Sequence, residues 1–518
     1  PRSTPLYSSA ASDVYKRQLL KHGNRLLVEP TTSQIIDILS PELTFTEKVQ
    51  HVGWKAKQEA KERGKGPIEL IDRPLFVLDH KSRIVCPYGF WKRIKHSLTK
   101  AGYSVKFKDL APWPPPEVMV PRWENIRDYK LRPGQKEFVS KVLAHRCGRF
   151  DCPPGFGKSF LIGLICALLP KAKIDVVTRR VPVLRDRIYP ELCQMVGDVG
   201  IVGGGKKRKG RRVMCYTAGS MQHAHNAGDT HLMFGDECHE LAADNASKKL
   251  MLWDRSRNYG LSASQDMRID GKDKRVEGIF GPIIYKVDYE EAQRHGLVIP
   301  IKVHWSNVTM DYNPLAGKAD DFVTRKRFGI WRNDVRNAVI ARDANRYDDN
   351  TQVLITCETL QHAVHLKKYL PDFTLVYREG SLKPWDRAKY AKMGLISEDE
   401  PLTNIKRRIW LTKQFEQGKL KKVIATTVWN VGVSFNALEV LIRADGGGSP
   451  INDVQIPGRV SRLSEGKTHG IVHDYLDQFN SSFEKRALSR ARTYKKNSWE
   501  QVMPKDSVLE NLLVRHED

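Results

Sequence analysis

The residues best placed to do chemistry form a short loop, Pro153-Pro154-Gly155-Phe156-Gly157-Lys158-Ser159, directly ahead of the apolar segment Phe160–Leu169. A glycine-bearing loop that opens a helix presents successive backbone N–H groups, and the helix N-terminus adds partial positive charge, so the loop can bind phosphates. Lys158 would reach the β- and γ-phosphates of ATP, and the Ser159 hydroxyl would bind Mg²⁺. The usual pattern fails only at its first position, where Cys152 replaces glycine. The nucleotide-binding residues expected here are Pro154, Gly155, Gly157, Lys158, Ser159 and Phe160.

A second chemical feature is the acidic pair Asp236-Glu237, which follows the apolar strand predicted for His231–Gly235. An aspartate at the end of a parallel strand can hold the water shell of Mg²⁺, and an adjacent glutamate can orient and deprotonate the attacking water. A bare acidic pair is usually a solvated loop. This pair follows the phosphate loop by about 80 residues, and the combination favours nucleotide hydrolysis.

The elements that must position these residues follow an α/β pattern. From residue 131 to about 300, short apolar strands alternate with helical stretches, and a second alternating region follows. Such alternation predicts two tandem lobes, each a parallel sheet flanked by helices. The strands expected are Ile174–Thr178, Val213–Thr217, His231–Gly235, Tyr259–Ser262, Gln352–Thr356, Thr374–Tyr377, Lys422–Thr426 and Glu439–Arg443.

The composition breaks divide the chain further. We expect a disordered or non-native leader over residues 1–18, and a small α+β accessory domain with a Pro-rich linker over 19–120. The first lobe should cover 121–300, the second 301–478, and a basic helical tail 479–518.

Charge and cysteine content bound the possible partners and the location of the protein. The chain has 518 residues, with 86 Lys and Arg against 60 Asp and Glu, for a net charge of +26. This excess predicts a polyanionic partner, either nucleic acid or an anionic membrane surface, and nucleic acid is favoured. The eight cysteines form no CxxC pair, which argues against a zinc ribbon or disulfide framework and suggests a reducing cytosol. No apolar run approaches the roughly 20 residues that a membrane span needs, so we expect a cytoplasmic protein, in a host cell if the gene is from a phage.

At Asp236-Glu237-Cys238-His239 the chain resembles the DExH branch of the superfamily 2 helicases. The resemblance implies two RecA-like lobes, and it predicts further motifs in order. Leu131-Arg132-Pro133-Gly134-Gln135 is similar to the adenine-reading element, in which Arg132 and Gln135 would bind the nucleotide. Gln455-Ile456-Pro457-Gly458-Arg459-Val460-Ser461-Arg462 matches QxxGRxxR. The resemblance makes Gln455, Arg459 and Arg462 catalytic, with the two arginines as forks on the γ-phosphate.

The same resemblance predicts residues that contact nucleic acid or couple hydrolysis to lobe movement. They are Thr178 and Arg179, Thr217 and Ser220, Ser262 and Ser264, Thr426, and His239 as an interlobe contact. Gly432 of Asn430-Val431-Gly432-Val433-Ser434 would bind the nucleotide, although Ser434 stands where the family often has aspartate. The continuation Arg268-Ile269-Asp270-Gly271 is similar to UvsW-like and XPB-like DNA helicases.

Several alternatives stay open. The basic run Gly203–Arg212 is either a solvated loop or a phosphate-backbone contact, and the tail Lys485–Lys496 either packs or contacts nucleic acid. The expected function is an ATP-dependent helicase or translocase on DNA, most plausibly branched DNA in phage-type replication, recombination or repair. A duplex translocase or remodelling switch without strand separation, a restriction-system motor, and an RNA helicase are the alternatives.

Overall fold

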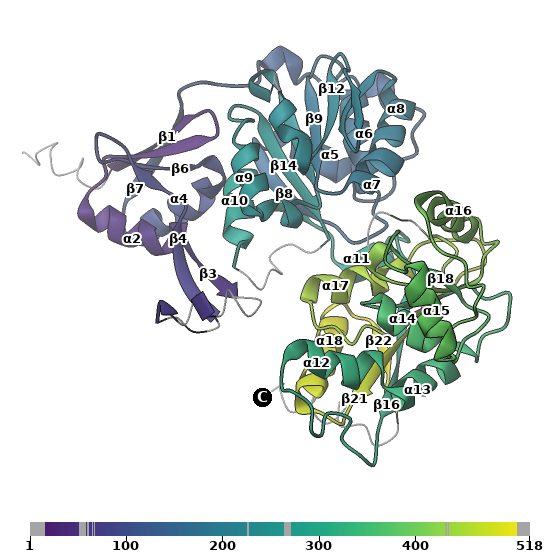
Figure 1. Ribbon diagram of the computed structural model, residues 1–518. Helices are drawn as coiled ribbons and strands as arrows, with labels where there is room; N and C mark the ends of the chain where they lie inside the picture. The colour runs from purple at the N-terminus through teal and green to yellow at the C-terminus, as the bar shows by residue number, and fades with distance from the viewer. Residues whose placement is uncertain are drawn as a thin grey trace, which may run out of the picture. The chain divides into compact units, whose positions relative to one another are not determined.

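The computed structural model describes residues 16–50, 58–59, 62–64, 66, 68–224, 227–263, 271–429, 433 and 435–504. The chain divides into two compact units (Figure 1). The first unit consists of Pro1–Cys152 and Gly157–Lys286, and the second of Pro153–Phe156 and Val287–Asp518. The sequence placed the boundary between the lobes at residue 300.

The first unit begins with the accessory domain, a five-stranded sheet with two helices and a separate hairpin. Leu39 and Leu43 of one helix and Ile94 and Leu98 of the other are fully buried, so these helices share a core with the sheet. The sheet order is β5 (Val77–Leu78), β6 (Ile84–Pro87), β2 (Arg25–Glu29), β1 (Lys16–His22) and β7 (Ser104–Asp109). The helices are α2 (Ser33–Leu43) and α4 (Trp91–Lys100), and the hairpin is β3 (Thr44–Gln50) with β4 (Ile68–Pro74).

The leader is shorter than the sequence indicated. Lys16, Arg17 and Gln18 were assigned to it, but they form the start of β1 and pair in parallel with Ser104–Lys106 of β7. Strand pairing satisfies their backbone groups, which the local sequence did not signal. Residues 1–15 lie outside the described residues.

Several polar contacts join the accessory domain to the first lobe. The side-chain amide of Asn24 donates to the carbonyl oxygens of Trp253 (2.6 Å) and Ser256 (3.1 Å). The Arg93 guanidinium forms a two-pronged ion pair with Glu277, at 2.8 and 3.1 Å. Glu277 lies on α10 (Asp273–Phe280), so the accessory domain is fixed to a helix of the lobe.

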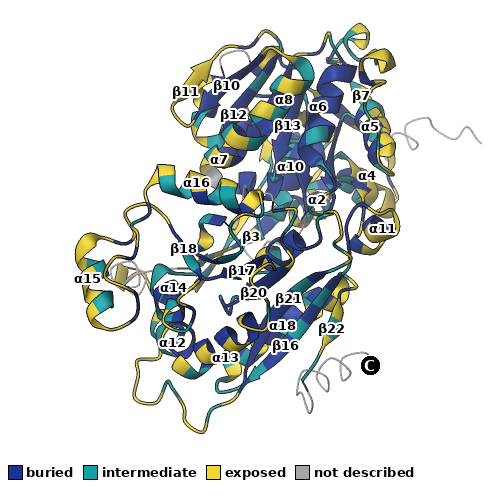
Figure 2. Cartoon of the chain, turned by 90° about the vertical axis from the view of Figure 1, so that its right-hand side faces the viewer, coloured by how far each residue is buried: buried dark blue, intermediate teal, exposed yellow. Residues whose placement is uncertain are grey.

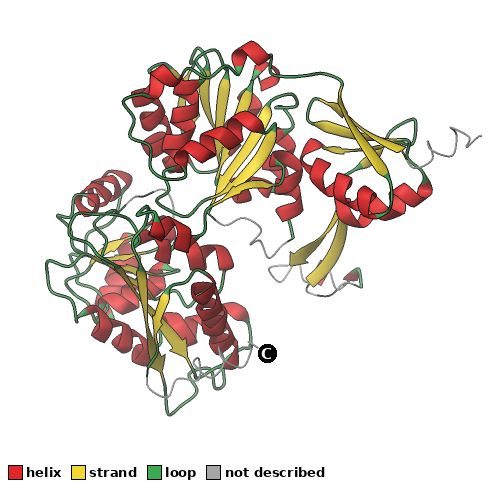
Figure 3. Ribbon diagram, turned by 180° about the vertical axis from the view of Figure 1, so that it is seen from behind, coloured by secondary structure: helices red, strands yellow, loops and turns green. Residues whose placement is uncertain are grey.

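The first lobe is an eight-stranded sheet whose strands are parallel except for the edge pair β10–β11. Its central strands are buried along their whole length, as expected for a parallel sheet covered by helices (Figures 2 and 3). The sheet order is β11 (Lys206–Arg208), β10 (Val199–Gly203), β12 (Val213–Thr217), β9 (Ile174–Thr178), β13 (Leu232–Asp236), β14 (Arg257–Ser262), β8 (Cys147–Asp151) and β15 (Ile283–Lys286). The helices are α5 (Gln135–Ala144), α6 (Lys158–Leu168), α7 (Val181–Val183), α8 (Tyr189–Val196), α9 (Asp244–Leu250) and α10.

The second unit is a seven-stranded parallel sheet with its own apolar core. The sheet order is β18 (Thr374–Val376), β19 (Lys422–Ala425), β17 (Val353–Thr356), β20 (Val440–Arg443), β21 (Gly470–Asp477), β16 (Ile301–Val308) and β22 (Glu500–Val502). The helices are α11 (Tyr289–Arg294), α12 (Phe322–Lys326), α13 (Asp334–Ala344), α14 (Leu360–Lys367), α15 (Pro384–Lys392), α16 (Ile405–Glu416), α17 (Pro450–Gln455) and α18 (Ser481–Lys496). These two parallel sheets confirm the predicted α/β class with tandem RecA-like lobes.

The basic tail helix α18 packs on the second sheet along one face. Arg490 is almost fully buried, and its Nε donates to the Asp474 carboxylate of β21 at 2.9 and 3.1 Å. The Tyr494 hydroxyl donates to the same carboxylate at 2.6 Å. Of the two alternatives for this tail, packing therefore accounts for its inner face, while Lys485 and Lys496 are exposed.

Candidate active site

The phosphate-loop lysine is held inside the first lobe. The loop joins the carboxyl end of β8 to the first turn of α6, and Gly157 adopts a left-handed φ of 89° just before Lys158. Lys158 is buried, and its ammonium donates to the Cys152 carbonyl oxygen at 3.3 Å. Ser159 is buried in the same turn. The two groups expected to meet phosphate and metal are thus positioned by the backbone at a helix N-terminus.

The acidic pair lies at the carboxyl end of β13, next to that lysine. Asp236 is the last residue of the strand, and Glu237 turns out of it with a left-handed φ of 47°. The Glu237 Oε1 atom is 4.0 Å from the Lys158 ammonium. Burial, and then the neighbouring Glu237 carboxylate, raise the pKa of Asp236 to about 6. Perturbed carboxyl groups of this kind are typical of functional sites.

Ser262 and His239 connect the acidic pair to the neighbouring strand. Ser262 ends β14, and its hydroxyl lies 2.7 Å from Nδ1 of His239 and 3.3 Å from Oε2 of Glu237. Nδ1 of His239 is itself 3.4 Å from the same carboxylate oxygen. The structure therefore gathers Lys158, Glu237, His239 and Ser262 into one cluster. His239 was predicted as an interlobe contact, and these interactions of its ring lie within the first unit.

The expected adenine-reading element adjoins the phosphate loop. The side-chain oxygen Oε1 of Gln135 accepts the Arg132 backbone N–H at 2.9 Å, which holds the Gln135 side chain in a buried position. A Cβ atom added to Gly157 would lie 3.2 Å from Nε2 of Gln135, so this amide packs against the loop. Arg132 itself is exposed. Sequence position alone did not indicate this proximity.

The expected nucleic-acid residues of the first lobe follow β9 and β12. Thr178 and Thr217 are buried strand ends in register with each other, so neither side chain is open to solvent. The Thr217 and Ser220 hydroxyls are 2.9 Å apart, and Ser220 is half-buried. Arg179 is exposed and remains available to a ligand.

Sequence reasoning missed an ion pair beside Arg179. The Arg180 Nε atom donates to both carboxylate oxygens of Glu240, at 2.9 and 3.0 Å. The pair ties the segment after β9 to the turn that follows the acidic box. An arginine next to one motif and a glutamate directly after another were the only signals, and neither specifies a partner.

The remaining predicted residues belong to the second unit. Gln455 ends α17, Arg459 is buried in the next turn, and Arg462 is half-buried. The Arg462 carbonyl oxygen accepts from Lys467 at 3.3 Å, and the Ser461 hydroxyl donates to the Gly458 carbonyl oxygen at 2.8 Å. These bonds fix the backbone of the arginine turn.

Three further predictions concern β14 and the segment after β19. Thr426 is buried, and its N–H donates to the Val376 carbonyl oxygen at 2.9 Å. Gly432 and Ser264 lie outside the described residues, as do Asn430, Val431, Ser434 and the continuation 265–270.

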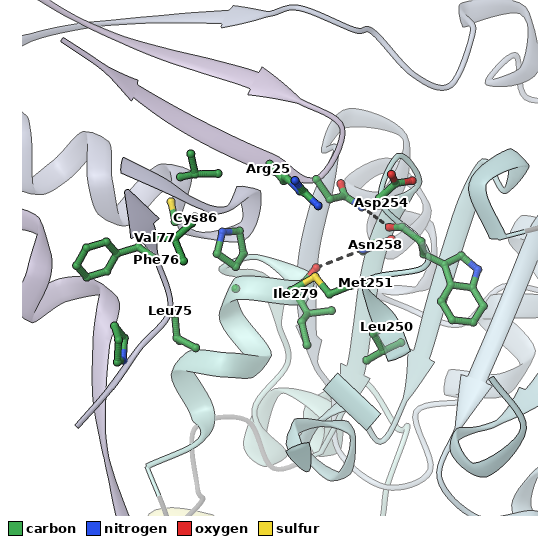
Figure 4. Close-up of a pocket in the computed structure, with 16 residues that line it drawn as sticks. Arg25, Leu75, Phe76, Val77, Cys86, Leu250, Met251, Asp254, Asn258 and Ile279 are labelled. Carbon is green, nitrogen blue, oxygen red and sulfur yellow. Dashed lines mark hydrogen bonds between the residues drawn. The ribbon is translucent and has the colours of Figure 1, made fainter. Parts of the chain in front are cut away.

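A cavity of about 480 Å³ lies between the accessory domain and the first lobe (Figure 4). Its walls are largely apolar and include Leu75, Phe76 and Met251, with Asp254 and Asn258 at one end. None of the predicted site residues is among those that line it. The cluster of Lys158, Glu237, His239 and Ser262 is therefore separate from this cavity.

Comparison with known proteins agrees with this geometry. The family "Helicase conserved C-terminal domain" matches residues 337–464. The DNA 3'-5' translocase XPB2 of Sulfurisphaera tokodaii is 24% identical over 364 residues, which are 66% of this chain and 79% of that protein. These matches, together with the order of the motifs, support a superfamily 2 helicase. It is an ATP-driven helicase or translocase, as the order of its motifs predicted.

Solved structures resemble this helicase in fold. A fragment of a putative HsdR subunit of a type I restriction enzyme from Vibrio vulnificus YJ016 has a TM-score of 0.50 at 17% identity, covering 87% of this chain and 81% of that chain. The T4 UvsW structure is 17% identical with a TM-score of 0.40, covering 94% of this chain and 99% of that chain. In the described part of the helicase, no helix is long and apolar enough to cross a membrane.

Proposed function

We propose that this helicase hydrolyses ATP with Mg²⁺ and uses the energy to move along DNA, with branched DNA as the favoured substrate. The cluster of Lys158, Glu237, His239 and Ser262 carries the hydrolytic part of the proposal. Its glutamate lies within 4.0 Å of Lys158, Ser262 and His239, and a general base must be held in position to take a proton from water.

The residues of the first lobe fit a Mg²⁺ ion bound together with nucleotide phosphates. Mg²⁺ in phosphate sites usually has one or two protein ligands and takes the rest from phosphate and water. A buried serine hydroxyl at Ser159 and a carboxylate at Asp236 supply that number. No group of three or more His, Cys, Asp or Glu side chains that could hold a metal occurs among the described residues. The bound ion would neutralise phosphate charge; burial, and then the Glu237 carboxylate, raise the pKa of Asp236 to about 6.

The chain's own groups then divide the work of hydrolysis. Lys158 would bind the β- and γ-phosphates from the helix N-terminus, and Glu237 would orient water and accept its proton. Ser262 and His239 would keep Glu237 in its unusual left-handed backbone position. Arg459 and Arg462 of the second unit would supply positive charge to the γ-phosphate as it leaves.

Preference for DNA over RNA rests on the DNA translocase relative and on the Arg268–Gly271 resemblance. The large positive charge predicts binding through phosphates, which is sensitive to salt and nearly independent of sequence. We place the enzyme in the cytoplasm, of a host cell if the gene is from a phage. A duplex translocase without strand separation, a restriction-system motor and an RNA helicase remain as outcomes of the test.

Steady-state ATPase assays with no polymer, single-stranded DNA, duplex, forked DNA and RNA, at two salt concentrations, test this function. Stimulation by DNA that is greatest on forks is the expected result, and an unwinding assay on the same forks would follow. Stimulation by duplex without unwinding would indicate a translocase or remodelling switch. Stimulation by RNA alone would replace the DNA proposal, and no stimulation by any polymer would refute the motor.

A further inference from the structure

The basic run Gly203–Arg212 takes part in a short hairpin at the edge of the first lobe. The sequence left open whether this run is a solvated loop or a phosphate-backbone contact. Gly203 pairs with Lys206 and Val202 with Lys207, so Gly204 and Gly205 are the two residues of the turn. Both have positive φ, 60° and 79°, as a type I′ hairpin turn requires. The two glycines thus explain why this charged run is ordered as a strand.

The turn of this hairpin lies beside the two elements expected to contact nucleic acid. Strands β9, β10 and β12 are parallel, so Thr178, Gly203 and Thr217 all stand at the carboxyl edge of the sheet. A Cβ atom on Gly203 would lie 2.6 Å from Cγ2 of Thr217. One on Gly204 would collide with Cγ1 of Val181, two residues after Arg179. Gly203 and Gly204 are therefore packed against these segments without room for a side chain, whereas Gly205 has open space around it.

The cations of the hairpin fall into two groups. The arginines are used within the lobe: Arg208 donates to the Tyr189 hydroxyl and to Asp198, while Arg212 donates to the Cys166 carbonyl oxygen. Lys206, Lys207 and Lys209 are exposed, and no ion pair joins them to any residue in the described part of the chain. Lys206 and Lys207 are the pair nearest the turn.

We propose that Lys206 and Lys207 bind phosphates of the nucleic-acid backbone and extend the contact surface that begins at Arg179 and Ser220. This inference rests on the proposed function. The ligand class is a polyanionic strand recognised through its phosphates, because lysine carries a point charge and reads no base here. Lys209 lies further from the carboxyl edge and contributes less.

A simpler role exists for lysine on an edge strand, since a charge there prevents pairing with another chain. That role needs no particular placement of the turn. It also predicts no change in the salt dependence of nucleic-acid binding, which gives the two roles different outcomes.

The test is binding of a labelled single-stranded oligothymidylate by fluorescence anisotropy across a salt series, with the full chain. Each lost phosphate contact on a single strand lowers the slope of log K against log salt by about 0.7. The Lys206→Ala, Lys207→Ala double variant should therefore lose about 1.4 from the slope, which is about 25-fold in affinity at 0.1 M salt and converges with wild type near 1 M.

Two controls make the result specific. Lys206→Arg with Lys207→Arg keeps both charges and should keep the wild-type slope. Lys171→Ala removes an exposed lysine from the loop before β9, at the opposite edge of the sheet, and should leave the slope unchanged. A wild-type slope in the double alanine variant would overturn the proposal, as would an affinity loss that is equal at every salt concentration. Absence of any binding by the wild-type chain would instead refute the proposed function.

Discussion

The two sheets of this helicase both bury carboxylates, but they surround them differently. In the first lobe, Asp236 is buried at a strand end beside a second carboxylate, and its pKa rises to about 6. In the second unit, Asp474 and Asp477 are buried on β21, and each is paired with a buried arginine. In the first lobe the Lys158 ammonium is 4.0 Å from the Glu237 carboxylate, whereas the second-unit pairs close at 2.8–2.9 Å.

Asp445, which follows β20, shows most clearly how a buried arginine pairs with a carboxylate in the second unit. Burial acts to raise its pKa, but the Arg443 guanidinium, bonded to it at 3.1 and 3.2 Å, holds the pKa of Asp445 at about 2. Arg443 also donates to Asp453 at 2.9 Å and so links α17 to the sheet. These charges fasten helices to strands, whereas in the first lobe burial and a second carboxylate raise the pKa of Asp236. The comparison predicts opposite responses to neutralising a carboxylate in the two units.

The largest expected effect is on ATP hydrolysis, and it would show that the second unit takes part in the reaction. Arg462→Ala should retain ATP binding and lose hydrolysis by about 10³–10⁵-fold, since a guanidinium on the γ-phosphate acts chiefly in the transition state. Nucleotide affinity and single-turnover hydrolysis measured together check this. Arg492→Ala on the exposed side of α18 is the matched control and should be silent. Loss of ATP binding without a separate rate effect would contradict the role of Arg462.

Neutralising a structural carboxylate should destabilise the protein. Asp474→Asn leaves the Arg490 guanidinium buried without its counter-charge, at a cost of about 3–5 kcal/mol in the free energy of unfolding. Urea unfolding followed by tryptophan fluorescence measures this, with the exposed Asp372→Asn as control. If the free energy of unfolding changed as little as in the control, the buried Asp474–Arg490 pair would not be stabilising the fold.

Neutralising Asp236, the buried carboxylate of the first lobe, should instead stabilise the protein at neutral pH. The folded state holds the Asp236 proton up to about pH 6, while the unfolded chain releases it near 3.8. The ligand-free protein therefore loses stability as the pH rises through this window, by at most about 3 kcal/mol. Asp236→Asn should remove that loss and be the more stable protein at pH 7. Urea unfolding at pH 4, 5, 6 and 7 tests this, and a variant less stable than wild type at pH 7 would refute it.

Much of this architecture follows from local pattern. The strands Ile174–Thr178 and Val213–Thr217 begin and end where apolar runs predicted, because a buried parallel strand is mostly apolar. The phosphate loop was predictable because its glycines are needed for the backbone geometry of the loop. The acidic box was predictable because its carboxylates are needed for their charge. The two parallel-sheet lobes were predicted from the same alternation, and their RecA-like character was implied by the resemblance to superfamily 2 helicases.

The cross-connections could not be predicted. Ser262 meets His239 across 23 residues of sequence, and Arg180 meets Glu240 across 60. No spacing rule specifies such contacts, since they depend on which strands become neighbours in the sheet. The start of β1 and the hairpin at Lys206 were missed for the same reason: their order depends on pairing partners, and their local composition is that of a solvated segment.

The central claim is that Glu237 is held by Lys158, Ser262 and His239 to activate water, and one variant tests it most directly. Glu237→Gln preserves the size and hydrogen-bonding capacity of the side chain but cannot accept the proton. ATP binding and DNA-stimulated hydrolysis should be measured side by side on this variant. We predict ATP affinity close to wild type with hydrolysis lowered by about 10²–10⁴-fold. Hydrolysis near the wild-type rate would contradict the account and remove Glu237 from the chemistry.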